Sequence, residues 1–254
     1  MKKISVIVPL YNRAKFIEAA LRSLVVQAAD CDLDIIVVDD GSTDEGPAIV
    51  HGMAERYPFI RMISTENQGV SKARNVGLKQ LRPGCEFVTF LDSDDVSTAA
   101  RLATDLAEFD ATPELSLTYG QIMMIDKIDH LTLAPTADSN TAIIRSIHVG
   151  AGIFRKSLVD RVGTFDESLP QGEDTDFLLR CFETGDPYRL VETITLYYRQ
   201  HAGNMSRDKE IVIKFLIHAL RRSIVRRRSN PGARIPENLF NMKALEHVYF
   251  EFEK

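Results

Sequence analysis

The feature that most constrains the fold is a regular alternation of strand and helix patterns over the first 110 residues. Short apolar runs rich in β-branched and aromatic residues, typical of buried strands, occur at 4–9, 35–38, 60–64 and 87–91. Apolar residues recur at helical spacing at 16–27, 49–57, 70–81 and 102–109. Four strand–helix units in succession predict an α/β fold with a Rossmann-like, mostly parallel sheet flanked by helices.

A polar cluster follows each predicted strand. The clusters lie at 11–13, 39–44, 66–74 and 92–95. The carboxyl ends of parallel strands meet at one edge of a sheet, where open α/β folds bind their ligands. We therefore expect these four clusters to lie close together and to form a site.

The last of these clusters holds three acids within four positions. Asp92, Asp94 and Asp95 directly follow the apolar run at 87–91. Carboxylates held this close repel one another unless a positive charge lies between them. Their oxygens suit Mg²⁺ or Mn²⁺, and Mg²⁺ commonly binds substrate phosphates as well. The segment favours a metal–diphosphate site about as much as the alternative, a turn whose acids cap the next helix.

Other phosphate-binding and catalytic motifs are missing from the sequence. The 150–152 stretch begins like a dinucleotide fingerprint, but Arg155 replaces its third glycine. There is no P-loop, no G-x-S-x-G nucleophile elbow and no H-E-x-x-H zinc motif. These absences leave the acidic cluster as the candidate for handling a phosphate group.

Composition narrows the class of protein further. A net charge of −5 does not favour nucleic acid as a partner. The three cysteines have no metal-site spacing, which suggests a reducing, cytoplasmic setting. No apolar run reaches 18 residues, and the segment at 4–10 is too short for a signal peptide.

The pattern changes after residue 113. Longer strands are predicted at 115–125 and 193–199, and a helix that begins with acids is predicted at 173–183. We expect one domain in two halves, 1–110 and 111–205, followed by a helical C-terminal extension at 206–254. The stretch 131–153 is expected to shape a second substrate site.

Five segments, taken together and in this order, resemble the family 2 glycosyltransferases. They lie at 5–12, 37–44, 67–75, 90–95 and 163–174. The resemblance implies the GT-A fold, a nucleotide-sugar donor and inversion at the anomeric carbon. The chain has no Q-x-x-R-W motif, no tryptophan and no predicted membrane span, so it is similar to the non-processive members.

The resemblance also implies roles for particular residues. Asp92-x-Asp94 matches the D-x-D motif, with Asp94 on the metal (Mn²⁺ or Mg²⁺) and Asp92 on the metal or the ribose. His201 resembles a histidine that contacts the metal or the diphosphate in some members; a structural or solvated histidine is an equal alternative. The expected nucleotide-binding residues are Pro9, Tyr11, Asn12, Asp40, Arg74, Asp92 and Ser93.

The acceptor half carries the matching candidate for a base. Asp174 aligns with the general base of the family, and Glu173 is expected to support it electrostatically. Alone, these two acids would indicate only a helix first turn, where negative side chains are favourable. Likewise, Asp39 and Asp40 alone would indicate turn hydrogen bonds.

The basic segment at 207–228 has three interpretations. It carries eight Lys and Arg against two Asp and Glu, a local charge of +6. Its apolar stripe of Val212, Leu216, Leu220 and Ile224 predicts docking on the core or in a homo-oligomer. The arginines at 226–228 predict peripheral contact with the inner face of a membrane, the alternative being a solvated face.

The sequence thus predicts a metal-dependent, inverting glycosyltransferase of bacterial-type glycan, polysaccharide or lipopolysaccharide synthesis. UDP is the default nucleotide, with GDP and dTDP as alternatives, and the acceptor is a glycan or a lipid-linked glycan. Two other functions remain open. One is a catalytically silent nucleotide-sugar-binding subunit. The other, less favoured because 8–13 is not a glycine-rich basic loop, is a sugar nucleotidyltransferase.

Overall fold

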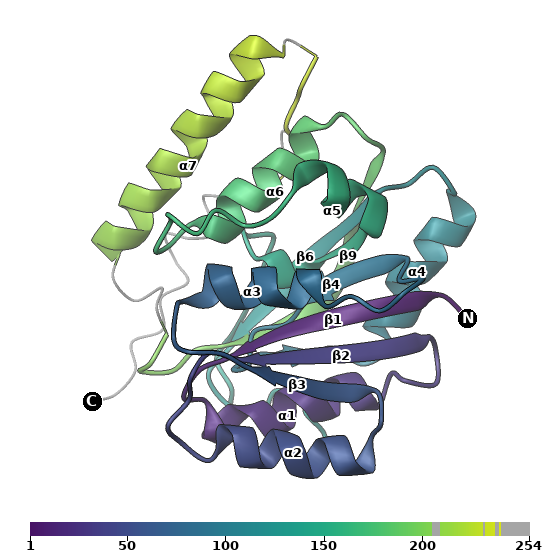
Figure 1. Ribbon diagram of the computed structural model, residues 1–254, viewed down its shortest axis with the longest axis vertical. Coiled ribbons are helices and arrows are strands. Elements are labelled where there is room, and N and C mark those ends of the chain that lie inside the picture. Colours follow the sequence, from purple (N-terminus) through teal and green to yellow (C-terminus); the bar gives the residue numbers. More distant parts are fainter. Residues whose placement is uncertain (205–208, 231, 237–238, 240–254) are drawn as a thin grey trace.

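A nine-stranded mixed sheet with helices on both faces forms the body of the protein (Figure 1). The computed structural model describes residues 1–204, 209–230, 232–236 and 239. Eight strands follow one another in the order β3-β2-β1-β4-β8-β6-β9-β5, and β7 pairs with β6. One sheet therefore runs through both expected halves of the chain.

The strands and helices have the following bounds. The strands are β1 (Lys3–Leu10), β2 (Asp32–Asp39), β3 (Ile60–Ser64), β4 (Phe87–Phe90), β5 (Val96–Ser97), β6 (Leu117–Ile125), β7 (Thr141–Ile144), β8 (Gly152–Arg155) and β9 (Tyr188–Arg199). The helices are α1 (Ala14–Val25), α2 (Gly46–Arg56), α3 (Val70–Lys79), α4 (Arg101–Ala111), α5 (Lys156–Val162), α6 (Glu173–Glu183) and α7 (Lys209–Ser229), with a 3₁₀ turn η1 (Val149–Ala151).

The alternation predicted for the first 110 residues is confirmed. β3, β2, β1 and β4 are neighbours and all pair in parallel. A helix follows each of β1, β2 and β3, and α4 follows β4 after the two-residue β5. The helices α1, α2, α3 and α4 overlap the four predicted helical segments. Their carboxyl ends share one edge of the sheet, as the argument for a common site required.

The side chains of β1 alternate between two hydrophobic cores. Val6 and Val8 pack in the core formed with α1, α2 and α4, whereas Ile7 packs in the core formed with α3, α5 and α6. Successive side chains of a strand point to opposite faces of the sheet, so a strand that is buried on both faces is apolar throughout. Figure 1 shows α1 and α2 on one side of the sheet and α3 and α6 on the other.

Helix α3 lies unusually close to β1. A Cβ atom on Gly77 would lie 2.5 Å from Cγ2 of Ile7, so only glycine permits this approach. Arg74 is one turn earlier in the same helix and is 3 % exposed. The close packing therefore fixes the position of an arginine that the site uses.

The second half differs from the expectation in several strands. β8 lies between β4 and β6 and is antiparallel to both. No strand was predicted there from the sequence, and neither β7 nor the two-residue β5 was predicted. β9 begins at Tyr188, five residues before the predicted start. The predicted helix at 173–183 is confirmed.

The C-terminal extension begins with the long helix α7, which packs on α6 (Figure 1). The start predicted at residue 206 and most of the predicted extension beyond residue 236 lie outside the described residues. Among the residues described, no helix combines the length and apolar composition needed to cross a bilayer.

Candidate active site

A cavity of about 740 Å³ opens at the carboxyl edge of the parallel strands. Its wall includes residues from all four polar clusters and from the start of α6. Of the residues predicted from the sequence, those lining it are Pro9, Tyr11, Asp40, Arg74, Asp92, Ser93, Asp94, Glu173 and Asp174. The predicted meeting of the four clusters is therefore confirmed.

Asp94 is held by two basic side chains. Its Oδ2 atom lies 3.0 Å from Nε of Arg13 and 3.1 Å from Nε2 of His201. Burial alone would raise the pKa of Asp94, but the hydrogen bonds from His201 and Arg13 lower it to about 2. Asp94 is thus a carboxylate at neutral pH, with Oδ2 engaged by both partners.

The His201 ring is fixed from two sides. It stacks on Phe16 with a centroid separation of 4.4 Å, and its Nδ1 accepts a hydrogen bond of 3.1 Å from the backbone N–H of Gly203. These contacts direct Nε2 toward Asp94. A separation of 3.1 Å is that of a hydrogen bond, and also roughly that of two neighbouring ligands about 2.1 Å from one cation.

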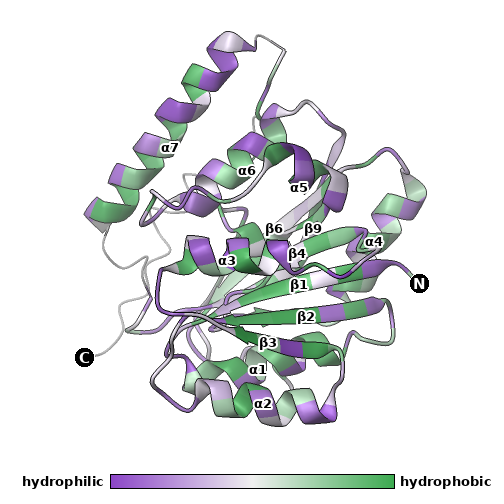
Figure 2. Ribbon diagram, in the orientation of Figure 1, coloured by the Kyte–Doolittle hydropathy of each residue, from purple (hydrophilic) through white to green (hydrophobic). Residues whose placement is uncertain are grey.

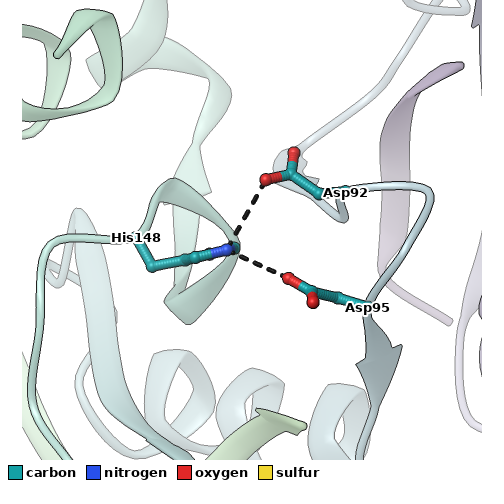
Figure 3. Close-up of side chains that lie close together, drawn as sticks. All are labelled: Asp92, Asp95 and His148. Carbon is teal, nitrogen blue, oxygen red and sulfur yellow. Dashed lines mark ion pairs between the residues drawn. The ribbon is translucent and has the colours of Figure 1, made fainter. Parts of the chain in front are cut away.

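His148 is a site residue that sequence reasoning missed. It precedes η1, and its Nε2 lies 3.1 Å from Oδ2 of Asp95 and 3.5 Å from Oδ2 of Asp92 (Figure 3). Burial would lower the pKa of His148, but Asp95 and Asp92 raise it above its ordinary value. Burial also raises the pKa of Asp95 to about 6. The sequence did not indicate this role, because His148 is a lone histidine that has no characteristic spacing to other metal ligands.

These residues fit a divalent cation. Ligand atoms of Asp92, Asp95 and His148 all lie within 4.8 Å of one another. Neither Asp95 Oδ2 nor His148 Nε2 has a hydrogen bond of acceptable geometry among the described residues, although both atoms are buried. Buried polar atoms without partners are costly, and carboxylate and imidazole donors suit Mn²⁺ and Mg²⁺.

Arg74 links the acids after β4 to those at the start of α6. Its Nη2 donates to Oδ1 of Asp92 and its Nη1 to Oε1 of Glu173, both at 2.7 Å. Burial would lower the pKa of Arg74, but Asp92 and Glu173 raise it above its ordinary value. The sequence had predicted a nucleotide contact for Arg74; the geometry shows a buried bridge between the two halves.

Both acids at the start of α6 have raised pKa values. Burial and the neighbouring Asp174 raise the pKa of Glu173 to about 7. Burial also raises the pKa of Asp174, although Arg74 and His148 oppose the shift. Asp174 lines the cavity, and its Oδ1 accepts a 2.6 Å hydrogen bond from the backbone of Thr175. A partly exposed carboxylate of raised pKa is suited to accept a proton.

Two of the predicted nucleotide-binding residues also hold loops in place. Asn12 has a left-handed backbone with φ of 51°, and its Oδ1 accepts a 2.8 Å hydrogen bond from the backbone of Thr43. The carboxylate of Asp40 accepts from the backbone N–H groups of Gln68 and Gly69 at 2.9 and 2.8 Å. Asp40 lines the cavity, whereas Asn12 is not among its lining residues and ties two loops together.

Much of the cavity wall outside the four polar clusters is apolar. It is formed by Ile122, Met124, Ile144, Ile147, Tyr198, Val212 and Leu216, with Arg145 among them. Part of this wall comes from the 131–153 stretch expected to shape a second substrate site. The rest comes from β6, β9 and α7, which are far apart in the sequence.

The sequence of this chain is similar to the sequences of known glycosyltransferases. The chain is 29% identical over 220 residues to the uncharacterized glycosyltransferase EpsJ of Bacillus subtilis, covering 80% of this chain and 62% of that protein. It is 27% identical over 226 residues to the poly(ribitol-phosphate) β-N-acetylglucosaminyltransferase TarS of Staphylococcus aureus, covering 78% of this chain and 35% of TarS. The chain thus spans less than two thirds of the length of these relatives.

Solved structures share the fold. TarS residues 1–349 in complex with UDP-GlcNAc match with a TM-score of 0.73 and 24% identity, over 92% of this chain and 68% of that one. The mannosyltransferase PcManGT of Pyrobaculum calidifontis, in complex with GDP-Man and Mn²⁺, matches with a TM-score of 0.68 and 20% identity, over 97% and 70%. The expected GT-A fold is therefore confirmed.

The family itself is shown by the sequence. The model of the family described as "Glycosyl transferase family 2" matches residues 5–154, more than half of the chain. This segment contains four of the five motifs that carried the resemblance. The chain belongs to glycosyltransferase family 2.

Proposed function

We propose that this protein is an inverting glycosyltransferase that moves a sugar from a nucleoside-diphosphate sugar to a hydroxyl group of a glycan acceptor. The observation that carries the proposal is the single cavity lined by Asp92 and Asp94 on one side and Asp174 on the other. Arg74 joins the two sides through its paired contacts with Asp92 and Glu173. The cavity thus offers a place for a diphosphate beside a carboxylate that can act as a general base.

The donor is assigned to the wall formed by the N-terminal motifs. Asp40, Tyr11 and Pro9 border the space assigned to the nucleobase and the ribose. UDP is the first nucleotide to test, since the structurally similar TarS binds UDP-GlcNAc. As the family resemblance implies, Asp92 and Asp94, with His201, would hold Mn²⁺ or Mg²⁺. The neighbouring group of Asp92, Asp95 and His148 shares Asp92 and is the second place where the residues fit the ion. Such an ion would neutralise charge on the leaving diphosphate as a Lewis acid.

The chemistry assigned to this chain's own residues is proton removal and positioning. Asp174 takes the proton of the acceptor hydroxyl while that oxygen forms a bond to the anomeric carbon. The bond from this carbon to the diphosphate breaks, and its electron pair leaves with the nucleotide. Attack opposite the leaving group inverts the anomeric configuration. Arg74 keeps Glu173 charge-balanced beside the base.

Thermal stabilisation by nucleotides tests the donor assignment. UDP, GDP, dTDP and CMP are each added with Mn²⁺ and with chelator, at about 100 times the dissociation constant. A ligand at this concentration stabilises by about 2.7 kcal/mol. The proposal predicts a melting shift with one nucleoside diphosphate that is lost with chelator. The same shift in chelator would contradict metal-dependent binding.

A further inference from the structure

Helix α7 has two different faces. Its inner face packs on the body of the protein, where Ala219 and Ser223 are fully buried. Arg222 lies 2.5 Å from Asp166, and Arg226 lies 2.6 Å from Glu183 and 2.8 Å from Asp176. These buried or half-buried ion pairs fix the rotation of α7 about its axis. They leave the opposite face pointing away from the core.

The fixed rotation removes Arg226 from the membrane contact predicted for the arginines at 226–228. Arg226 is turned inward and engaged by two acids of α6, so it is not available to lipid. The predicted apolar stripe is also only partly buried, since Val212 lines the cavity but Ile224 is 44 % exposed. A four-residue step advances about 40° around a helix, which carries such a stripe off one face within three steps.

The outer face of α7 combines exposed apolar and basic side chains. Ile213, Ile217, Ile224 and Val225 are 55, 51, 44 and 61 % exposed. Lys214, Arg221 and Arg228 are exposed as well and recur every seven residues. Residues seven apart differ by only about 20° around a helix, so the three cations form a row beside the isoleucines. Figure 2 shows hydrophobic and hydrophilic segments interleaved along α7.

A second copy of the chain would fit this face poorly. Ile213, Ile217, Leu220 and Ile224 have the alternating spacing of a coiled-coil seam. Two such seams would bring the rows of basic residues together, and the helix has no acid after Glu210 to pair with them. Like charges brought together oppose association. The charge on the face therefore calls for an anionic partner.

An anionic bilayer accommodates both components of this face. Isoleucine side chains enter the boundary between headgroups and acyl chains, while Lys and Arg meet lipid phosphates. A soluble polyanion would use the cations but leave four large apolar side chains in water. We propose that the outer face of α7, defined by Ile213, Lys214, Ile217, Arg221, Ile224, Val225 and Arg228, docks the protein on an anionic lipid surface.

This docking would bring the apolar side of the cavity near the membrane. Val212 and Leu216 of the same helix line the cavity, on the side assigned to the acceptor. An acceptor carried by a lipid would then reach Asp174 without leaving the surface. The second step rests on the proposed function, whereas docking itself is measured without any substrate.

Vesicle sedimentation with the full chain tests the proposal. Vesicles of phosphatidylcholine with added phosphatidylglycerol are compared with vesicles of phosphatidylcholine alone. We expect sedimentation with the anionic vesicles that falls at least about tenfold in the double variant Lys214→Glu/Arg221→Glu, since each basic residue near the surface contributes to binding. The matched control Arg56→Glu/Lys79→Glu changes the charge equally on exposed ends of α2 and α3 and is expected to bind like the wild type.

A second pair of variants tests the apolar part of the face. Ile213→Ser/Ile217→Ser is expected to weaken vesicle binding about tenfold. Its control, Val26→Ser/Ile143→Ser, removes apolar side chains of similar exposure elsewhere and is expected to have little effect. Melting temperatures close to the wild-type value establish that each variant is folded.

Several outcomes would overturn the proposal. One is the absence of binding to anionic vesicles. Another is an equal loss of vesicle binding in the control variants. A third is binding to polyphosphate, a soluble polyanion, that survives Ile213→Ser/Ile217→Ser. A dimer that this pair dissociates, without vesicle binding, would assign the face to a second copy. Failure of every nucleotide to bind, with vesicle binding intact, would instead remove the proposed function and leave the docking surface.

Discussion

The two sides of the cavity are built in different ways. On the side proposed for the donor, Asp40, Asp92 and Asp94 follow parallel strands and are held by hydrogen bonds or ion pairs, as Asp94 is by Arg13 and His201. On the side proposed for the acceptor, apolar residues from β6, β9 and α7 form much of the wall. The difference suggests that the donor side fixes chemistry by electrostatics, whereas the acceptor side selects its substrate by shape and packing.

The largest effect is expected where the two sides meet, at Asp174. Asp174→Asn keeps the size of the side chain but cannot take a proton. We expect turnover to fall by about 10²–10⁴-fold, the usual contribution of a general base. Nucleotide binding with Mn²⁺ should stay within twofold of the wild type. Near-normal transfer would assign the base to another residue.

Breaking the bridge between the sides should lower stability. Arg74→Gln leaves Asp92 and the buried Glu173 without their shared cation. Removing one partner of a buried pair costs about 3–5 kcal/mol. A urea titration measures the loss. Lys72→Gln, on the same helix with a single hydrogen bond to Gln68, is the control and is expected to change stability little. Equal losses in the two variants would refute the bridge.

Asp94→Ala tests the donor side alone. Removing a ligand of the ion weakens the charge stabilisation that the ion gives to the diphosphate, which is worth several kcal/mol. We therefore expect the Mn²⁺-dependent affinity of Asp94→Ala for UDP to fall by roughly 100-fold. Calorimetric titration with Mn²⁺ and with chelator measures it. Asp126→Ala, another turn acid far along the chain, serves as the control. Unchanged Mn²⁺ dependence in Asp94→Ala would place the cation elsewhere.

The pH dependence of transfer activity, measured as the release of UDP, follows from the raised pKa of Asp174. Burial favours its protonated form, and only the carboxylate can accept a proton. Activity should therefore fall as pH decreases through a value above 3.8, the ordinary pKa of an aspartate. The apparent value belongs to the interacting pair of Glu173 and Asp174. An acid limb at 3.8 would argue against Asp174 as the base.

The smallest effect is expected on the acceptor side. Ile147→Ala removes part of the apolar wall. Ile147 is half-buried, so the acceptor is expected to lose contact with the equivalent of one to two CH₂ groups. At about 0.8 kcal/mol each, acceptor KM should rise about four- to fifteenfold. The affinity for UDP should not change. A variant that weakened UDP binding instead would show that this wall belongs to the donor.

The position of the acids at the strand ends was predictable from the sequence because it depends on local patterns. An apolar run followed by Asp92 and Asp94 predicts both a strand and the edge at which its acids emerge. Parallel geometry then brings Asp40 and the acids together. Likewise, the acids at 173–174 were correctly placed at a helix start.

Features that depend on tertiary pairing were not predictable. His148 reaches Asp95 only because β8 inserts antiparallel between β4 and β6. Nothing in the residues around 148 indicates that pairing. Similarly, the arginines at 226–228 look equivalent in the sequence, yet of these three it is Arg226 that pairs with the acids of α6. Periodicity describes a helix but not the charges that it will face.

The configuration of the released sugar tests the central claim most directly, and it needs no known acceptor because water can take the place of the acceptor. Proton NMR follows the slow hydrolysis of UDP-α-sugars, beginning with UDP-GlcNAc, in the presence of Mn²⁺. The account predicts that the β-anomer appears first, before mutarotation, and that neither chelator-treated protein nor Asp174→Asn releases it. Initial release of the α-anomer, or no release from any UDP-sugar when UDP binds, would contradict an inverting transferase with Asp174 as its base.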